Sequence, residues 1–179
     1  MKILKSLILS LGMAASVFAQ ATTINFSSYS GTLAGVGNAH FSLAGVGEQG
    51  TPSVGNGYLY NSIDGSAYPT NSILKISFDE SVSGVMFTFN TFGTKATTAW
   101  SLFGDGHTLI STGHLSNGDT LYNLSQYSGV RSIEYNNGGN DWYFGVKNLS
   151  FNVIPEPGML PLLGLGMAGL MLARRRRAA

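Results

Sequence analysis

Five dipeptides in which glycine follows asparagine or aspartate divide the middle of this chain into short segments. They are Asn56-Gly57, Asp64-Gly65, Asp105-Gly106, Asn117-Gly118 and Asn137-Gly138. Asparagine and aspartate tolerate a positive φ, and glycine adopts it freely, so these pairs suit the tight turns between antiparallel strands. A chain with so many tight turns is restricted to short strands, and no convincing amphipathic helix lies between them.

The segments between these turns alternate between apolar and polar side chains. Residues 73–78 (ILKISF) place Leu74, Ile76 and Phe78 on one face of a strand, and residues 85–92 (VMFTFNTF) repeat the pattern. A period of two is typical of a strand with one buried face. Residues 100–110 (WSLFGDGHTLI) predict a hairpin that turns at its Asp-Gly pair, and the segments RSIEY, WYFGV and LSFNV predict later strands.

These strands predict an all-β domain over residues 22–153, with the fold of an antiparallel β-sandwich or jelly roll. A length of about 130 residues is ordinary for one such domain. A curled barrel would be built from the same short strands and turns, so the sequence leaves sandwich and barrel as alternatives.

The charge of this middle region argues against a nucleic-acid partner. Although the whole chain carries a formal net charge of +1, residues 22–153 hold four basic side chains against eight acidic ones, a net charge of −4. Nucleic-acid binding requires a basic surface, and we expect none here. The chain also has no cysteine, which excludes a disulfide, a thiolate metal site and a cysteine nucleophile.

The first 21 residues predict a secretory signal peptide. Lys2 and Lys5 form a positive region, and an apolar stretch over residues 7–17 follows them. Small residues then offer cleavage after Ala19 or after Ala21. An uncleaved membrane anchor is the alternative, but the apolar stretch is short and ends in small residues, which favours removal. We therefore expect the mature protein to be exported through the secretion translocon.

Residues 154–179 predict a C-terminal membrane segment with a defined orientation. Residues 158–173 form a run of 16 residues without charge, which as a helix spans roughly 24 Å. This is slightly short for a bilayer core of ~30 Å, but arginine side chains snorkel to the interface. The run is followed by four arginines that stay on the cytoplasmic side, namely Arg174, Arg175, Arg176 and Arg177. The middle of the chain then lies outside the membrane.

The tripeptide Pro155, Glu156 and Pro157 lies between the predicted β-domain and this run. Proline fixes its own φ and keeps the preceding residue extended, so the two prolines hold a short extended stretch near the membrane surface. Extended backbone is what the cleft of a protease or transferase commonly accepts. A stiff spacer is the alternative, and the apolar run with its arginines favours a processing signal over it.

The order of Pro-Glu-Pro, apolar helix and arginine cluster over residues 154–179 resembles the PEP-CTERM sorting signal. The resemblance implies a bacterium with a Gram-negative envelope and recognition by an exosortase, an integral membrane transpeptidase or protease. It also implies an inner-membrane-anchored precursor, processing at or near the tripeptide, and a final place at the cell surface or in an exopolysaccharide matrix. Many members carry a β-sandwich just before the signal, and WYFGVKNLSFNV is similar to their last strands.

Few residues of the middle region indicate chemistry. Neither a nucleophile elbow nor a phosphate-binding loop is present, and the spacing of the eight acids selects no pair for glycoside hydrolysis. We therefore expect no enzyme activity. Residues 136–141 (NNGGND) concentrate side-chain oxygens, so calcium is a candidate there, with a plain polar loop as the alternative; otherwise we expect no metal and no cofactor. The expected surface or turn residues are His40, His107, His114, Asp105 and Asp119.

Exposed aromatic side chains stack on sugars, and five are candidates for this role. They are Tyr58, Tyr60, Tyr68, Trp142 and Tyr143. Burial in the core of the sandwich is the alternative for such residues. The sequence thus predicts a non-enzymatic surface or matrix protein that is sorted through its C-terminus. A carbohydrate-binding or adhesive module is the second hypothesis, and a hydrolase that acts on polysaccharide is the third.

Overall fold

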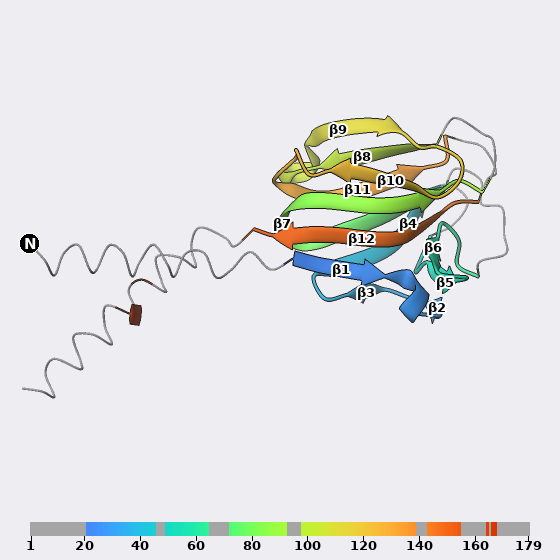
Figure 1. Ribbon diagram of the computed structural model, residues 1–179, viewed down its shortest axis with the longest axis horizontal. Helices are drawn as coiled ribbons and strands as arrows, with labels where there is room; N and C mark the ends of the chain where they lie inside the picture. The colour runs from blue at the N-terminus through green and yellow to red at the C-terminus, as the bar shows by residue number, and fades with distance from the viewer. Residues whose placement is uncertain are drawn as a thin grey trace, which may run out of the picture.

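The computed structural model of the chain describes residues 21–45, 49–64, 72–92, 98–138 and 143–154, together with residues 164, 166 and 167 (Figure 1). The five longer ranges contain twelve strands, and every strand pair among them is antiparallel. The all-β, antiparallel fold class that the sequence predicts is therefore confirmed.

The strands form two layers that pack face to face, so the domain is a β-sandwich (Figure 1). The layer in front in Figure 1, called the front layer, contains β10 (Thr120–Leu124), the second half of β7 (Ser72–Asn90), β12 (Gly145–Val153) and β1 (Ala21–Asn25). Three short strands continue it beside the start of β12, namely β6 (Tyr58–Tyr60), β5 (Ser53–Gly55) and β2 (Gly31–Thr32).

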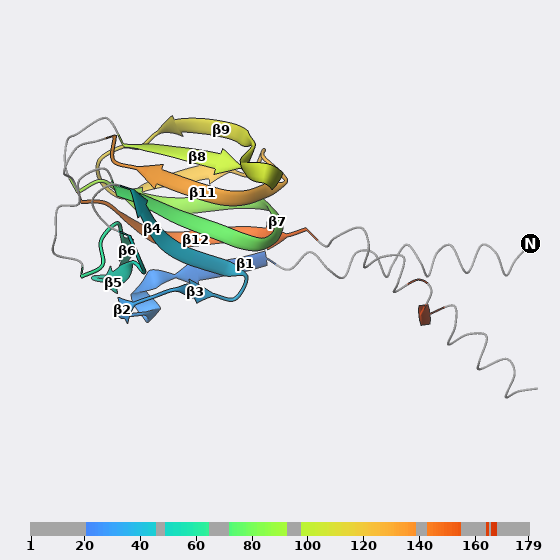
Figure 2. The ribbon, with the colours of Figure 1, turned by 180° about the vertical axis from the view of Figure 1, so that it is seen from behind.

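The back layer faces the viewer in Figure 2. It contains, in order, β3 (Gly35–Val36), β4 (Ala39–Gly45), the first half of β7, β11 (Val130–Asn136), β8 (Ala99–Phe103) and β9 (Leu109–His114). The five longer described ranges also contain two 3-10 helices: η1 (Phe26–Ser28) follows β1, and η2 (Asp105–His107) joins β8 to β9. The predicted hairpin over residues 100–110 is thus confirmed as the β8–β9 pair.

β7 is 19 residues long and belongs to both layers. Its first half pairs with β4 and β11, and its second half pairs with β10 and β12. The sequence predicts two short strands here, and this prediction is wrong because no turn separates them. The chain stays extended where β7 crosses between the layers, and backbone groups there form hydrogen bonds. The N–H of Asp79 donates to the carbonyl oxygen of Asn38, and the carbonyl oxygen of Ser81 accepts from the N–H of Ile154.

The crossing also exchanges the two faces of β7. Leu74, Ile76 and Phe78 face the core in the first half, whereas Phe87 and Phe89 face it in the second, so the inward positions change from even to odd numbers. The register between β7 and β12 shifts in the same region, as expected for a β-bulge. The alternation predicted for each half is confirmed, and the bulge joins the two patterns.

Aromatic pairs connect the two layers through the core. Phe78 of β7 contacts Phe151 of β12 at a ring-centroid distance of 4.8 Å. Tyr135 of β11 contacts Phe87 and Phe89 of β7 at 5.1 and 5.2 Å. All five side chains are buried, and burial of one such side chain contributes roughly 1.5–3 kcal/mol to stability.

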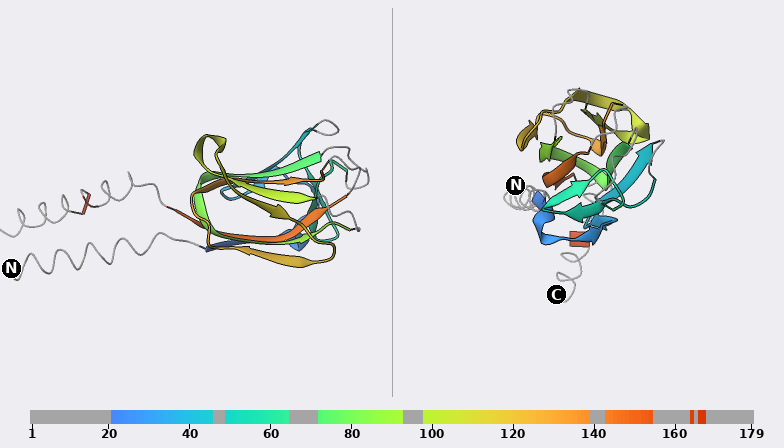
Figure 3. Two further views of the ribbon diagram at one scale, coloured as in Figure 1. Left: turned by 90° about the horizontal axis from the view of Figure 1, so that it is seen from above. Right: turned by 90° about the vertical axis from the view of Figure 1, so that its right-hand side faces the viewer.

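Both ends of the described sandwich leave from the same side (Figure 3). β1 pairs with β12 so that Ala21 lies opposite Asn152, and the N–H of Ile154 donates to the oxygen of Ser81 at 2.8 Å. The described sandwich therefore extends to Ile154, the residue before Pro155. The opposite end of the sandwich carries the β5–β6 turn and the end of β7 (Figure 1).

The hydroxyl of Tyr135 lies in the core without a hydrogen-bond partner among the described residues, and burial raises its pKa well above the ordinary value. Tyr135→Phe removes this hydroxyl and keeps the ring. We expect the free energy of unfolding, measured by urea denaturation, to stay unchanged or to rise by up to about 3 kcal/mol, because an unsatisfied buried polar group is lost.

Tyr122→Phe is the matched control. Its hydroxyl accepts a hydrogen bond from the N–H of Ser116 at 2.5 Å, so its removal should lower the free energy of unfolding by about 0.5–1.5 kcal/mol. If Tyr135→Phe destabilises the protein more than Tyr122→Phe does, the Tyr135 hydroxyl has a partner in solution and the prediction is wrong.

Candidate functional site

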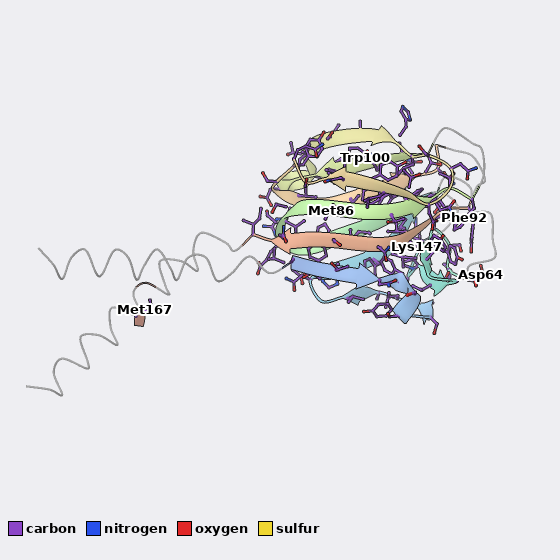
Figure 4. All side chains as sticks on the ribbon, in the orientation of Figure 1. Asp64, Met86, Phe92, Trp100, Lys147 and Met167 are labelled. Carbon is purple, nitrogen blue, oxygen red and sulfur yellow. The ribbon has the colours of Figure 1, made fainter. Side chains whose placement is uncertain are left out.

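Four aromatic rings gather at the end of the front layer that lies away from the two chain ends; Figure 4 labels Phe92 there. Tyr60 stacks on Tyr143 at a ring-centroid distance of 4.6 Å, and Phe92 contacts Tyr58 at 4.9 Å and Tyr143 at 5.6 Å. Phe92 is 37% exposed, Tyr58 and Tyr143 are half-buried, and Tyr60 is buried. We call these four residues the aromatic cluster.

Two unusual backbone conformations present these rings. The turn between β5 and β6 has positive φ at Asn56 (51°) and Gly57 (82°), which is the hairpin turn that Asn-Gly favours, and it leads directly into Tyr58. Phe92 has a φ of 49°, and its N–H donates to Oδ1 of Asn90 at 2.8 Å. Positive φ at a bulky residue costs of order 1–3 kcal/mol, and such strain clusters at functional sites.

Beside the rings, one carboxylate binds donors from three other strands. Oδ1 of Asp119 accepts hydrogen bonds from the hydroxyl of Tyr58 at 2.5 Å and from Nδ2 of Asn90 at 2.9 Å. Its Oδ2 accepts from Nζ of Lys147 at 2.6 Å, and this Nζ lies 5.7 Å from the centre of the Tyr58 ring. We call these four residues the polar cluster.

Strand pairing explains how these residues meet. β10 pairs with β7 in a register that places Asp119, just before β10, next to Asn90 at the end of β7. β12 has a register shift between Val146 and Asn148, so Lys147 lies in a bulge that turns its side chain to the outer face. The polar cluster therefore forms a row across the outer face of the front layer, where Figure 4 shows Lys147.

These contacts hold the polar cluster in one protonation state. The hydrogen bond from Lys147, followed by that from Tyr58, lowers the pKa of Asp119 to about 2. The same hydrogen bond raises the pKa of Lys147. Desolvation, followed by the hydrogen bond to Asp119, raises the pKa of Tyr58, and burial raises that of Tyr143.

The carboxylate and the ammonium thus stay charged, and both phenols stay protonated, over the physiological pH range. A general acid or base works best with a pKa near the operating pH, and Asp119 lies far from it. The site offers hydrogen-bond donors and acceptors of constant charge, which suits binding rather than proton transfer.

The outer face of the front layer continues from the polar cluster as two rows of uncharged side chains, which we call the outer strip. The first row is Leu121, Thr88, Asn148 and Asn25, and the second is Asn123, Met86, Ser150 and Thr23. Leu121 is 66% exposed and Met86 36% exposed, and the other six carry an amide or a hydroxyl.

The outer face of the back layer has a different character, because several of its ionisable side chains lie in pairs there. The pairs are Lys75 with Glu134 at 3.2 Å, His40 with Asp79 at 2.8 Å, and Arg131 with Asp105 at 2.7 Å. His107 stacks on Phe103 at 4.0 Å and lies 3.9 Å from Glu134. All three histidines are exposed, as expected for surface residues.

Tyr60 also lines a cavity of about 310 Å³. β2 and β5 line one part of it, and Ile63 and Asp64 line another. Because Tyr60 belongs to both the cavity and the aromatic cluster, the cavity extends the site towards β2.

Three of the five aromatic candidates come together, since Tyr58, Tyr60 and Tyr143 belong to the aromatic cluster. Tyr68 and Trp142 lie outside the described residues. Sequence reasoning missed Phe92 because it assigned the residue to an alternating strand. The available signal was Asn90 two positions earlier, since asparagine commonly binds the backbone N–H two residues on.

The loop proposed for calcium is described only in part. Oδ1 of Asn136 accepts from the N–H of Gly138 at 2.8 Å, and Asn137 is buried, whereas residues 139–141 lie outside the described ranges. Within those ranges, no three side chains of histidine, aspartate or glutamate come together as a metal site. Calcium binding by residues 136–141 stays a prediction.

Most residues of the predicted export and sorting signals also lie outside the described residues, and these are Ala19, Pro155, Glu156, Pro157, Arg174, Arg175, Arg176 and Arg177. Ala21, the other cleavage candidate, is the first residue of β1. Within the residues that the structure describes, no helix has the length and apolar character that crossing a membrane requires.

Comparison with known families identifies the C-terminal segment. The profile of the PEP-CTERM protein-sorting motif matches residues 153–177. The chain carries a PEP-CTERM sorting motif. The match begins at Val153, the last residue of β12, so the sorting motif follows the sandwich without a linker. The resemblance stated from the sequence is confirmed.

Comparison with curated protein sequences finds no match. Among solved structures, the chain is similar to a fucose-binding module of Streptococcus pneumoniae, with 12% identity, a TM-score of 0.46, and coverage of 72% of this chain and 94% of that one. It is also similar to a family 29 carbohydrate-binding module complexed with cellulohexaose, with 13% identity, a TM-score of 0.47, and coverage of 74% and 92%.

A third similar structure is a family two carbohydrate esterase from Cellvibrio japonicus. Its identity is 13% and its TM-score 0.45, and the match covers 76% of this chain and 35% of that one.

Asp119→Asn tests the electrostatics of the polar cluster. The pKa of Asp119 in the folded protein is about 2, which lies below its ordinary value of 3.8. The ionised carboxylate therefore stabilises the folded state at pH values above 3.8. We expect the wild type to be more stable than the variant at neutral pH. The difference should shrink as the pH falls from about 4 and should vanish only below about pH 2.

Urea denaturation at several pH values measures this difference. Lys147→Gln serves as a second variant, because it removes the largest cause of the shift and should move the loss of stability to higher pH. A difference between wild type and Asp119→Asn that stays constant down to about pH 2 would contradict the prediction.

Proposed function

We propose that this chain is an exported surface protein that is delivered through its C-terminal sorting motif and binds carbohydrate, without catalysis, at the aromatic cluster. The match of residues 153–177 to the sorting motif supports the delivery. The aromatic cluster with its neighbouring hydrogen-bonding side chains supports the binding.

The proposed delivery begins with the signal peptide, residues 1–21, which directs the chain to the secretion translocon and is cleaved after Ala19 or Ala21. The C-terminal segment then holds the precursor in the inner membrane with Arg174, Arg175, Arg176 and Arg177 on the cytoplasmic side. An exosortase processes the chain at or near the Pro-Glu-Pro tripeptide, and the sandwich reaches the cell surface or the extracellular matrix.

The arrangement of the sandwich fits this route. β1 and β12 bring both chain ends to one end of the domain, and the aromatic cluster lies at the other (Figures 1 and 4). Since the described sandwich extends to Ile154, the sorting motif attaches the domain by the end opposite the site. The aromatic cluster of an anchored precursor would then point away from the membrane.

The chemistry of the two clusters suits a sugar. Partly exposed rings such as Phe92 and Tyr143 offer apolar faces to the C–H face of a pyranose ring. The phenol of Tyr58 and the amide of Asn90 lie beside them and can exchange hydrogen bonds with hydroxyl groups. Apolar surface with a few placed polar groups is the usual composition of a small-molecule site.

Phe92→Ala tests the binding. The affinity for soluble polysaccharide, measured by retardation in polyacrylamide gels that contain it, should fall about tenfold. This is the loss expected for removal of an aromatic contact worth ~1.4 kcal/mol. Phe103→Ala is the matched control, because this ring lies in the back layer and stacks on His107. A larger loss with Phe103→Ala than with Phe92→Ala would place the site on the back layer and contradict the proposal.

Replacement of the four arginines by glutamine tests the delivery. Because the basic cluster sets the orientation of the membrane segment, we expect the variant to be retained and processed abnormally, as measured by cell fractionation and by the mass of the mature chain. Glu156→Ala should leave export intact and impair processing. Normal sorting of the arginine variant would contradict the proposed delivery, and normal processing of Glu156→Ala would leave the tripeptide as a spacer.

A further inference from the structure

The outer strip extends the site beyond the aromatic cluster. We infer that the carbohydrate site continues from the aromatic cluster along the outer strip and takes an extended, uncharged polysaccharide chain. This inference rests on the proposed function and adds the class of ligand to it.

The strip is continuous with the two clusters. Thr88 lies two residues before Asn90 on the same face of β7, and Phe92 follows two residues after it. In the next strand, Asn148 adjoins Lys147 and pairs with both Thr88 and Asn25. The clusters and the strip therefore form one surface on neighbouring strands of the front layer, where Figure 4 shows Met86 and Lys147.

The absence of unpaired charge on this surface favours an uncharged ligand. The eight residues of the strip carry no charge, and the two ions of the polar cluster, Asp119 and Lys147, neutralise each other. An acidic polysaccharide would require unpaired arginine or lysine side chains, which bind carboxylates strongly. Four asparagine and serine side chains of the strip, Asn25, Asn123, Asn148 and Ser150, instead supply neutral donors and acceptors that match sugar hydroxyls.

The length of the surface favours a polysaccharide chain over a single sugar residue as the ligand. Met86 and Asn90 are four residues apart on β7, which at ~3.4 Å per residue corresponds to a distance of about 14 Å. A single pyranose covers only a fraction of this length. The ligand that fills the surface is therefore several sugar residues long.

A second copy of the chain is the other occupant to consider for such a face. Stable protein interfaces bury about 800 Å² on each partner around an apolar centre. Within the described residues, the strip has two exposed large apolar side chains, Leu121 and Met86, and its remaining side chains are polar. This composition matches a hydroxyl-rich ligand better than a protein interface.

The experiment uses the full chain, purified in detergent, and isothermal titration calorimetry with polymers of different charge. The neutral probes are a soluble β-glucan, a mannan and a galactan, and the anionic probe is alginate. The proposal predicts binding to at least one neutral polymer and none to alginate. With oligomers of the bound polymer, the affinity should rise with chain length up to several sugar residues.

The paired variant Thr88→Ala with Asn148→Ala separates the strip from the aromatic cluster. It should reduce the affinity for the longest oligomer to that for the disaccharide, a loss of about tenfold, and should leave the disaccharide affinity unchanged. Phe92→Ala should weaken binding at every length. The matched control is Ser42→Ala with Ser77→Ala on the back layer, which should bind as the wild type does, and thermal melting verifies that each variant is folded.

Each contrary outcome has a distinct meaning. Equal affinity for the disaccharide and the longest oligomer, with no effect of the strip variant, would overturn the extended site and leave the proposed function standing. Preference for alginate would overturn the uncharged ligand. Failure of all four polymers to bind would overturn the proposed function together with this inference. If the wild type is a dimer and the Leu121→Ser variant is a monomer, a second copy covers the strip, and the inference is overturned.

Discussion

The sandwich depends on the crossing of β7 from one layer to the other. The two halves of this strand supply the central positions of both layers, between β4 and β11 in the back and between β10 and β12 in front. The crossing requires that inward side chains change from even to odd positions, which the bulge near Gly84 (φ 64°) accomplishes. An added side chain at Gly84 would approach Nδ2 of Asn152 to 2.5 Å, so the chain is closely packed there.

The same crossing determines the surface on which the site is built. Because the second half of β7 points Met86, Thr88 and Asn90 outward, these residues join their neighbours on β10 and β12. Lys147 reaches the same surface through the bulge in β12, and its contact with Asp119 keeps the pKa of that carboxyl near 2. The uncharged outer strip of the front layer and the paired ionisable groups of the back layer thus follow from strand register.

The sequence predicted local features well where a local rule governs them. The Asn56-Gly57 turn, the β8–β9 hairpin and the buried faces of residues 73–78 and 85–89 follow from turn chemistry and side-chain alternation, and the structure confirms them. It failed at residues 79–84, because the choice between a turn and a crossing depends on backbone partners such as Asn38 that are distant in sequence. Tyr58, Tyr60 and Tyr143 were identified as candidates, but their contact with Phe92 depends on a positive φ that phenylalanine itself does not favour.

The C-terminal sorting motif is the part of this protein that the sequence determined by itself. A tripeptide, an apolar run and a basic cluster act through composition and order along the chain, so a sorting motif can be recognised without a fold, and the match over residues 153–177 confirms the motif as a whole. The arrangement of the candidate site was decided by the tertiary structure. Its members lie on or directly beside β6, β7, β10 and β12, and only strand pairing brings the carboxylate of Asp119 to Tyr58, Asn90 and Lys147.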